Sequence, residues 1–296
     1  MPRKGLGYRI YGRILRELSP FLSDRLYLKL LFKHRVGYSL NLNNPRSFNE
    51  KLQWLKLNDI HSEYTQMVDK VDAKKYVASI IGDKYIIPTL GVWNSVEEID
   101  WDILPNQFVI KVSSDSGGIV VCKNKAKLDI ESAKRKLKKG WGKNYYLYNK
   151  EYPYKDVKPR IIAEKYMEDT VTKELRDYKF FCFNGEPRIL KVDYNRFIEH
   201  RANYYDVNKN ILLFGEEICP PDYNKKIEFP SNLDDMVQIA RKIAQSIPFV
   251  RVDLYNVNSQ IYFGEITFFP ASGTGKFTSL EWDYKLGDMI QLPIVR

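Results

Sequence analysis

The sequence predicts an α+β fold, with helices and antiparallel sheets in separate layers. Two observations lead to this prediction. Short runs rich in β-branched and aromatic residues are joined by tight turns more often than by helices, which is typical of hairpins rather than of parallel βαβ units. Apolar residues also recur at helical spacing at the start of the chain and again near residues 233–246. We therefore expect sheets built from hairpins, with amphipathic helices packed on them.

The composition is that of an ordinary globular protein. The chain has 296 residues, of which 44% are hydrophobic and 28% are charged, with 14 Pro and 16 Gly. These proportions exclude a disordered chain, a collagen and a disulfide scaffold. The three cysteines, Cys122, Cys182 and Cys219, are odd in number and scattered, which points to free thiols in the cytoplasm. No apolar run approaches the ~18 residues of a membrane span, and the basic start lacks the apolar stretch of a signal peptide.

Residues 1–36 carry an excess of positive charge. Nine of their side chains are basic and two are acidic, and apolar residues recur at helical spacing on either side of Pro20. This pattern predicts two short amphipathic helices broken at that proline. Two interpretations stay open: a face that contacts an anionic membrane or another polyanion, and a solvated face of helices packed on the main domain. We expect no nucleic-acid partner, because the basic residues are confined to this segment and no nucleic-acid-binding motif occurs.

In the first half of the chain, helix signals come before strand signals. Ser47 followed three residues later by Glu50 is typical of a helix N-terminus, so a helix should run from there past Leu57. A second helix fits residues 68–81 and ends at Gly82. Strands are expected at residues 85–88, 107–112 and 117–122, and a charged surface helix at residues 131–139.

The second half repeats this mixture of strands and helices. Its strongest turn signal is Asn184-Gly185, which predicts a hairpin between strands at 177–183 and 188–194. Further elements are expected as a strand at 161–166, a helix at 233–246, and a strand pair at 249–254 and 260–267 joined by a turn at 256–258.

One stretch could hold a phosphate group. The strand that ends at Lys111 is followed at once by the Ser/Gly-rich loop of residues 113–118. Small residues let backbone amides approach phosphate oxygens, and the lysine supplies a positive charge. An ordinary hairpin turn would have the same composition.

A second group of polar residues lies on the last strand pair. Alternation places Arg251 and Asp253 on one face of their strand, and Glu265 and Thr267 on one face of the next. If these faces coincide, two carboxylates converge beside an arginine, which suits magnesium bound together with a nucleotide. The alternative is a cross-strand salt bridge on a solvated face of the sheet.

Several of these runs occur together in a known order. The chain resembles the ATP-grasp superfamily in six of them: Asp69-Lys70, Tyr85-Ile86-Ile87-Pro88, Phe108-Val109-Ile110-Lys111, Ile162-Ala163-Glu164-Lys165-Tyr166, Arg251-Val252-Asp253 and the run 264–270. Three more, at 44–51, 176–181 and 265–270, are similar to the TupA-like branch, which is named for teichuronopeptide synthesis and found in bacterial surface-polysaccharide clusters. The resemblance covers about residues 35–292.

The resemblance implies a fold and a set of roles. The fold would be a basic helical region at 1–68, a nucleotide-binding lobe at 69–160 and a second lobe at 161–296, with antiparallel sheets that enclose ATP. Nucleotide phosphates would be held by Lys70, Lys111, Ser113, Ser116, Gly117 and Gly118. Adenine would pair with the backbone of Glu164, Lys165, Tyr166 and Met167, and the ribose with Glu174 or Asp177. Mg²⁺ would be bound by Asp253, Glu265 and Thr267, while Arg251 steadies the transferred phosphate.

The implied reaction is a carboxylate–amine ligation that uses ATP and passes through an acyl phosphate. The carboxylate would be a uronate of a glycan or lipid-linked precursor, and the amine an amino acid or amino sugar. Two alternatives remain: a glycosyltransferase of the same pathway, using Asp100 and Asp102 to hold a metal-bound sugar nucleotide, and a nucleotide-binding adaptor without catalysis.

Overall fold

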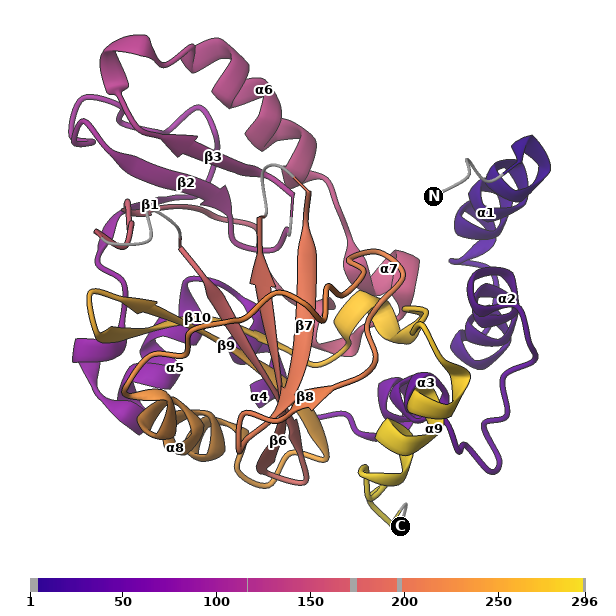
Figure 1. Ribbon diagram of the computed structural model, residues 1–296. Coiled ribbons are helices and arrows are strands. Elements are labelled where there is room, and N and C mark those ends of the chain that lie inside the picture. Colours follow the sequence, from indigo (N-terminus) through magenta and orange to yellow (C-terminus); the bar gives the residue numbers. More distant parts are fainter. Residues whose placement is uncertain (1–4, 116, 171–174, 196–198, 295–296) are drawn as a thin grey trace.

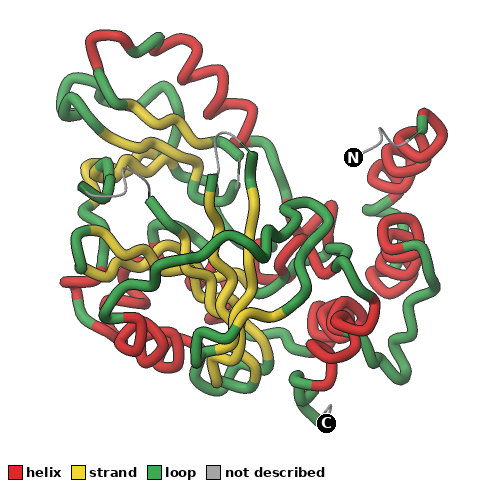
Figure 2. The backbone as a smooth tube through the Cα atoms, in the orientation of Figure 1, coloured by secondary structure: helices red, strands yellow, loops and turns green. Residues whose placement is uncertain are grey.

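The structure is a computed structural model that describes residues 5–115, 117–170, 175–195 and 199–294. Within these residues the chain forms two antiparallel sheets surrounded by helices (Figures 1 and 2). A four-stranded sheet has the order β1-β4-β2-β3, and a six-stranded sheet has the order β10-β9-β5-β6-β7-β8. The α+β class predicted from the hairpin-rich sequence is confirmed.

The smaller sheet carries one helix on its apolar face. Its strands are β1 (Thr89–Trp93), β2 (Phe108–Val112), β3 (Ile119–Cys122) and β4 (Ile161–Lys165). Helix α6 (Ile130–Trp141) packs on β2 and β3, and Leu137 of α6 shares a core with Phe108, Ile110 and Val112, which are fully buried. Because side chains alternate along a strand, Lys111 lies on the other face of this sheet.

The larger sheet is built from four consecutive strands, β5 to β8, each antiparallel to the next, and from the hairpin β9–β10, which pairs with β5. Its strands are β5 (Asp177–Phe183), β6 (Glu186–Tyr194), β7 (Arg201–Asp206), β8 (Ile211–Leu212), β9 (Phe249–Val257) and β10 (Gln260–Thr267). The predicted turn between β5 and β6 is present, with φ of 52° at Asn184 and 83° at Gly185. Helices α5 (Asp72–Ile81) and α8 (Leu233–Ala244) pack against this sheet.

One face of the larger sheet changes from apolar to charged along its strands. At one end Phe181 and Phe249 pack around Phe48. At the next positions on the same face, Lys179 lies opposite Asp253. The aromatic end therefore anchors the sheet to the helices, and the charged end is left for a functional site.

The N-terminal third is helical, as expected. The capping box predicted at Ser47 is present, since its hydroxyl accepts from Glu50 N at 3.2 Å and Glu50 Oε2 accepts from Ser47 N at 3.2 Å. Figure 1 shows the first two helices lying to one side of the body. No helix in the described part of the chain is long and apolar enough to cross a membrane. The remaining helices are α1 (Leu6–Leu18), α2 (Asp24–Val36), α3 (Phe48–Asn58), α4 (Glu63–Val68), α7 (Tyr145–Asn149), α9 (Leu280–Asp288) and the 3₁₀ helices η1 (Asp83–Tyr85), η2 (Lys125–Lys127), η3 (Tyr152–Tyr154) and η4 (Pro270–Gly273).

Three element predictions need correction. The helix expected at 68–81 begins at Asp72, because the Asp69 carboxylate accepts from the backbone N–H of residues 71 and 72 and starts a new helix there. Of the strand expected at 85–88, Tyr85 lies in η1 and Ile86 makes an isolated parallel bridge with Phe263, and β1 starts only after Pro88, which has no N–H for a ladder. The turn between β9 and β10 falls at residues 258–259, both with positive φ, rather than at 256–258.

Sheet membership crosses the expected boundary at residue 160. Strand β4, which the sequence assigns to the lobe at 161–296, pairs with β1 and β2 of the smaller sheet. Helix α5, which the sequence assigns to the lobe at 69–160, contacts β10 of the larger sheet. The chain therefore enters and leaves the smaller sheet more than once.

Candidate functional site

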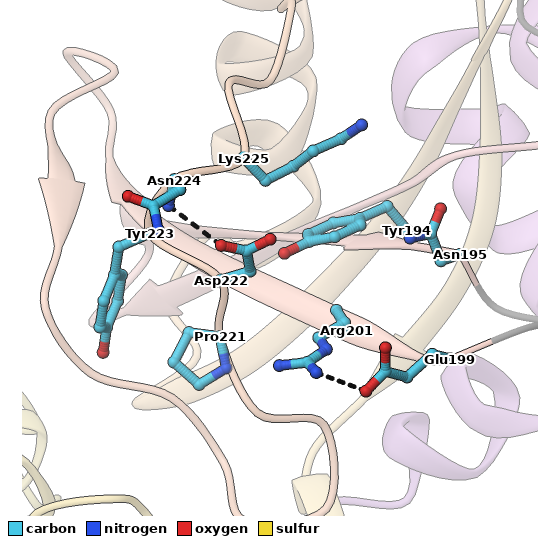
Figure 3. A pocket seen from close by; sticks show the side chains of 9 residues that line it. All are labelled: Tyr194, Asn195, Glu199, Arg201, Pro221, Asp222, Tyr223, Asn224 and Lys225. Atoms are coloured by element: carbon cyan, nitrogen blue, oxygen red, sulfur yellow. Dashed lines mark hydrogen bonds and ion pairs between the residues drawn. The ribbon is translucent and has the colours of Figure 1, made fainter.

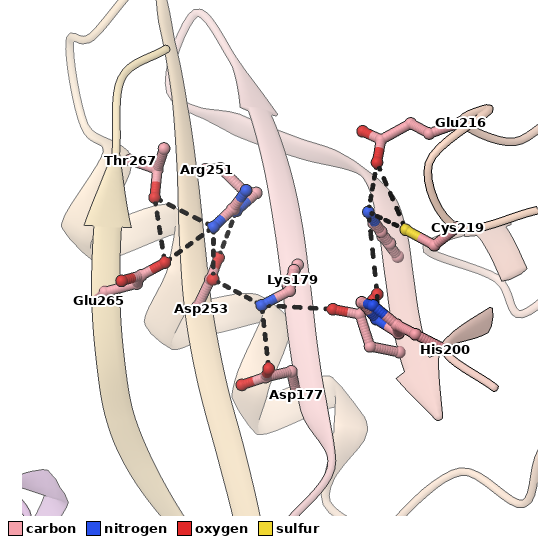
Figure 4. Close-up of polar contacts among 11 residues, drawn as sticks. Asp177, Lys179, His200, Glu216, Cys219, Arg251, Asp253, Glu265 and Thr267 are labelled. Carbon is pink, nitrogen blue, oxygen red and sulfur yellow. Dashed lines mark hydrogen bonds and ion pairs between the residues drawn. The ribbon is translucent and has the colours of Figure 1, made fainter. Parts of the chain in front are cut away.

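A row of charged side chains crosses the larger sheet from β10 to β6 (Figure 4). Residues directly opposite each other share a face, and the register pairs Glu265 with Asp253, Asp253 with Lys179, and Lys179 with Lys191. The convergence expected for Arg251, Asp253, Glu265 and Thr267 is therefore present. The Asp253 side of this pairing is buried, since Asp253 is only 1% exposed.

Asp253 is the centre of this row. Arg251 donates to both of its carboxylate oxygens, from Nε at 2.6 Å and from Nη2 at 2.7 Å, and Lys179 Nζ donates at 2.9 Å. Burial alone would raise the pKa of Asp253, but the two cations outweigh burial and hold this pKa well below its usual range. The carboxylate is therefore ionised and fixes the orientation of Arg251.

Glu265 is the open carboxylate of the row. Arg251 Nη2 donates to Glu265 Oε1 at 2.9 Å and to Thr267 Oγ1 at 3.1 Å, while 42% of the Glu265 side chain stays exposed. Carboxylate and hydroxyl oxygens are the hard donors that Mg²⁺ prefers, so the donor set fits magnesium. Glu265 and Thr267 are accessible for such a role, whereas both oxygens of Asp253 already hold cations.

The row continues into residues of which the sequence analysis singled out only Asp177. Lys179 Nζ also lies 3.1 Å from Asp177 and 3.4 Å from Asp193. Farther along, Lys191 Nζ lies 2.6 Å from Glu216. Burial would raise the pKa of Glu216, but Lys191 keeps this pKa below its ordinary value. The whole row is thus a set of mutually neutralising ions.

The end of the row contains three possible metal ligands. One atom each of Asp193, His200 and Cys219 lies within 4.8 Å of the others. Lys191 Nζ, however, lies 3.5 Å from the Cys219 sulfur and 3.8 Å from Asp193 Oδ1. A positive charge already occupies this group, which disfavours a metal ion there.

Lys111 reaches the site from the smaller sheet. Its Nζ lies 2.5 Å from Glu164 Oε2, and Lys74 of α5 lies 2.6 Å from Glu164 Oε1. Burial would raise the pKa of Glu164, but the two lysines hold it below its ordinary value. The side chain of Glu164 therefore fixes Lys111 in place. Lys74 is a further residue that the sequence analysis missed.

Lys70 is hydrogen-bonded to the Ser/Gly-rich loop. Its Nζ donates to the carbonyl oxygens of Ser113 at 3.3 Å and Asp115 at 2.8 Å. Burial lowers the pKa of Lys70, while the negative charge of Glu265 on the larger sheet opposes this shift. The charged form of this loop-bound lysine is therefore favoured by the open carboxylate of the larger sheet.

The loop itself is held by side chains. The Ser113 hydroxyl is buried and donates to Asp69 at 3.0 Å, so it is committed to the loop's own structure. The Asp115 carboxylate accepts from Lys143 at 3.0 Å and from Tyr145 at 2.9 Å. A Cβ on Gly118 would lie 3.0 Å from a Val112 methyl group, so there is little space for a side chain at this position.

The remaining residues expected at the site differ in exposure and in hydrogen-bond partners. Ser116 and Glu174 lie outside the described residues. Gly117 and Lys165 are exposed, and Tyr166 donates to Glu168 at 2.8 Å. Met167 is half-buried, and Asp177 is buried beside Lys179. Asp100 and Asp102 are exposed residues of one turn, in which the Asp100 carboxylate accepts a hydrogen bond from Asp102 N at 3.0 Å.

A hollow of about 560 Å³ opens at the end of the hairpin β6–β7 (Figure 3). Its lining is mostly polar and includes two tyrosines and two basic side chains. Tyr194 follows Asp193 directly along β6, so its side chain lies on the face of the sheet opposite the charged row. Residues of the lining include Tyr194, Arg201, Asp222, Tyr223 and Lys225.

The chain matches the model of a known protein family. The family model described as TupA-like ATPgrasp matches residues 50–291. The chain belongs to this family. The suspected resemblance is therefore confirmed, and with it the ATP-grasp fold.

A search of curated proteins finds no match. Solved structures that are similar include D-alanine–D-alanine ligase from Bacillus anthracis complexed with ATP, at 16% identity, 76% coverage of this chain, 63% of that chain and a TM-score of 0.43. Another is N5-carboxyaminoimidazole synthetase from Staphylococcus aureus complexed with ADP, at 16% identity, 88% coverage of this chain, 57% of that chain and a TM-score of 0.42. The chain spans less than two thirds of the length of either protein.

Proposed function

We propose that this protein is an ATP- and magnesium-dependent carboxylate–amine ligase. The observation that carries the proposal is the open carboxylate of Glu265, bonded to the half-buried Arg251 on one sheet, together with Lys70, which is bonded to the Ser/Gly-rich loop of the other. Membership of the TupA-like ATP-grasp family supports it. The site thus offers positive side chains for the phosphates of a nucleoside triphosphate and oxygen ligands for the magnesium ion that accompanies it.

The proposed reaction has two steps. A substrate carboxylate oxygen attacks the γ-phosphorus of ATP, the bond to the β,γ-bridging oxygen breaks, and ADP leaves. An amine nitrogen then attacks the carbonyl carbon of the acyl phosphate, loses a proton, and inorganic phosphate leaves as the amide forms. Bound magnesium would neutralise charge on the phosphate oxygens.

The protein's own contribution is positioning and charge. Arg251, fixed by Asp253, would stabilise the phosphoryl group in flight, and Lys111, fixed by Glu164, would hold the phosphates. Lys70 would act beside Lys111, and the backbone of Gly117 and Gly118 would close over the phosphates. Adenine would lie at residues 164–167 and the ribose at Asp177 or Glu174. Thr267 would join Glu265 at the metal.

We place the carboxylate substrate among uronates of a surface glycan or its lipid-linked precursor, and the amine among amino acids or amino sugars. The hollow at the end of β6–β7 offers two tyrosine rings, on which a sugar ring could stack, and Lys225 for a carboxylate, whereas Arg201 already pairs with Glu199. The reaction would take place in the cytoplasm, where ATP is available, with the basic N-terminal segment near the inner face of the membrane.

The test is direct. Pure protein is incubated with Mg-ATP and a panel of uronates and amines, and the products are analysed for ADP and an amide by mass spectrometry. Hydroxylamine in place of the amine should trap the acyl phosphate as a hydroxamate. ATP binding without ADP formation would favour an adaptor, and release of a nucleoside diphosphate from a sugar nucleotide would favour a glycosyltransferase. Either result would overturn the ligase.

A further inference from the structure

Helix α1 exposes a wide apolar face. Large side chains on α1 are between 44 and 66% exposed, and Phe21 in the following turn is 83% exposed. Exposed apolar residues are common singly, but this group is concentrated on one 13-residue helix. The exposed residues of α1 are Leu6, Ile10, Tyr11, Ile14 and Leu18.

The exposed face is distinct from the face that packs on the protein. At about 100° per residue, Leu6, Ile10 and Ile14 form one row, because they are four residues apart. The packed side is narrower: Leu15 is buried, and the Tyr8 ring stacks on His34 of α2 with centroids 3.8 Å apart. Contact with α2 therefore leaves most of the apolar surface of α1 uncovered.

Basic side chains flank this apolar face. On the same angular scale Arg9, Arg13 and Arg16 fall on the side opposite Tyr11 and Leu18, beside the row that starts at Leu6. The first turn has no acidic residue, and the one acid of α1, Glu17, pairs with Arg13 at 3.2 Å. An apolar face with an arginine-rich border is the pattern of helices that lie in the plane of a membrane surface.

We propose that α1 binds the surface of an anionic lipid bilayer and inserts its apolar face among the acyl chains. This goes beyond a charge-based contact of the basic segment, and it does not depend on the ligase reaction. A lipid surface fits better than a second copy of the chain, because the arginine border would repel an identical helix. At 13 residues α1 is too short to span a bilayer, so it would lie flat.

The placement of α1 would also orient the body of the protein. Through α2 the helix pair is fixed to the segment that leads to η3: Tyr27 Oη donates to Tyr148 O at 2.9 Å, and Lys150 Nζ lies 3.0 Å from Asp24. Tyr154 of η3 packs against the ring of Tyr145 with centroids 5.3 Å apart, and Tyr145 donates to Asp115 of the Ser/Gly-rich loop at 2.9 Å. A membrane-bound α1 would thus hold the site at a fixed height above the lipid surface.

The experiment is flotation of the full chain with phosphatidylcholine vesicles, with and without an equal share of phosphatidylglycerol, at 0.1 and 0.5 M NaCl. The apolar variant is Leu6→Ser/Ile10→Ser/Ile14→Ser. Its matched control is Ile211→Ser/Leu213→Ser/Ile218→Ser, which removes exposed apolar residues elsewhere. The charge variant is Arg9→Gln/Arg13→Gln/Arg16→Gln, matched by Arg135→Gln/Lys136→Gln/Lys139→Gln on the exposed side of α6.

We expect the wild type to float with anionic vesicles and to remain partly bound at high salt, since apolar burial is not screened. The apolar variant should lose partitioning by about 100-fold or more, and the charge variant should lose mainly the preference for anionic lipid. Both controls should float like the wild type.

A second measurement reports insertion directly. An environment-sensitive NBD dye on Ile14→Cys should shift its emission to the blue with anionic vesicles, while the same dye on Ile218→Cys should not. The proposal would be overturned if the wild type did not float with anionic vesicles, or if the apolar variant and its control lost partitioning equally. It would also be overturned if analytical ultracentrifugation showed dimers that Ile10→Ser/Ile14→Ser abolishes. No step uses ATP, so the outcome is separate from that of the ligase assay.

Discussion

Arg251 and Asp253, two residues apart on one strand, form a two-pronged ion pair with bonds of 2.6 and 2.7 Å. The same guanidinium still reaches Glu265 and Thr267 on the next strand. One arginine therefore links a fully buried carboxylate to an open one. Asp253 is therefore the buried acid of the cluster and Glu265 the accessible one, and substitution of each can test this difference.

The first prediction concerns these two acids. Glu265→Gln keeps the shape of the side chain but removes an exposed charge, so turnover should fall on the order of 100-fold with little change in the melting temperature. Asp253→Asn should reduce turnover similarly and also destabilise the fold by about 3 kcal/mol, because it leaves Arg251 and Lys179 short of a buried partner. Steady-state kinetics and calorimetry on both variants check this. Equal stability losses would mean that the two carboxylates share one role.

A second prediction concerns Lys111. Mg-ATP should raise the melting temperature of the wild type, because a ligand that binds only the folded state stabilises it, and UDP-sugars should not. Lys111→Ala should weaken that ATP-dependent shift. Lys136→Ala, which removes an exposed lysine from α6, is the control and should keep the full shift. A shift in Lys111→Ala as large as in the control would place Lys111 outside the nucleotide site.

Alternation predicted which residues of β9 share a face and which residues of β10 share a face, but not the register that brings the two faces together. A plain two-residue turn at 258–259 would place Asp253 opposite Gly264, and a bulge between Phe263 and Glu265 shifts the register so that Asp253 lies opposite Glu265. The row beyond Asp253 depends on a second bulge. A plain two-residue turn at Asn184-Gly185 would place Lys179 opposite Leu190. A bulge between Phe181 and Cys182 shifts the register by one residue, so that Lys179 lies opposite Lys191.

Other parts of the site depend on contacts that local patterns do not contain. Lys74 looks like any charged residue of an amphipathic helix, and only packing of α5 brings it to Glu164. Glu216 lies in a loop that bridges to Phe277 far along the chain. The strand predicted at 85–88 failed for a local reason, because Pro88 cannot donate to a ladder.

The third prediction is a pH dependence of stability. The pKa values of Asp253, Glu164 and Glu216 are held below their ordinary values by buried cations. Such groups contribute stability that is present above the unfolded pKa of about 4 and is lost as the pH falls through the lower folded pKa. The free energy of unfolding in urea should therefore decrease from about pH 5 downward. Asp253→Asn should flatten this dependence, whereas Glu281→Gln at an exposed position should follow the wild type.

The last prediction concerns the packing beneath the Ser/Gly-rich loop. A Cβ on Gly140 of α6 would lie 2.7 Å from Asp115 Oδ2, closer than real contacts allow, and 3.0 Å from Gly118 Cα, which is also tight. Gly140→Ala should therefore displace Asp115 from Lys143 and Tyr145 and move the loop that Lys70 holds. We expect weaker ATP binding by isothermal calorimetry, on the order of tenfold. Gly142→Ala is the matched control two residues on, because its Cβ would meet nothing within 4 Å. If Gly140→Ala bound ATP as tightly as Gly142→Ala, the loop would not be part of the nucleotide site, since the substitution moves the loop without touching Lys111, Arg251 or Glu265.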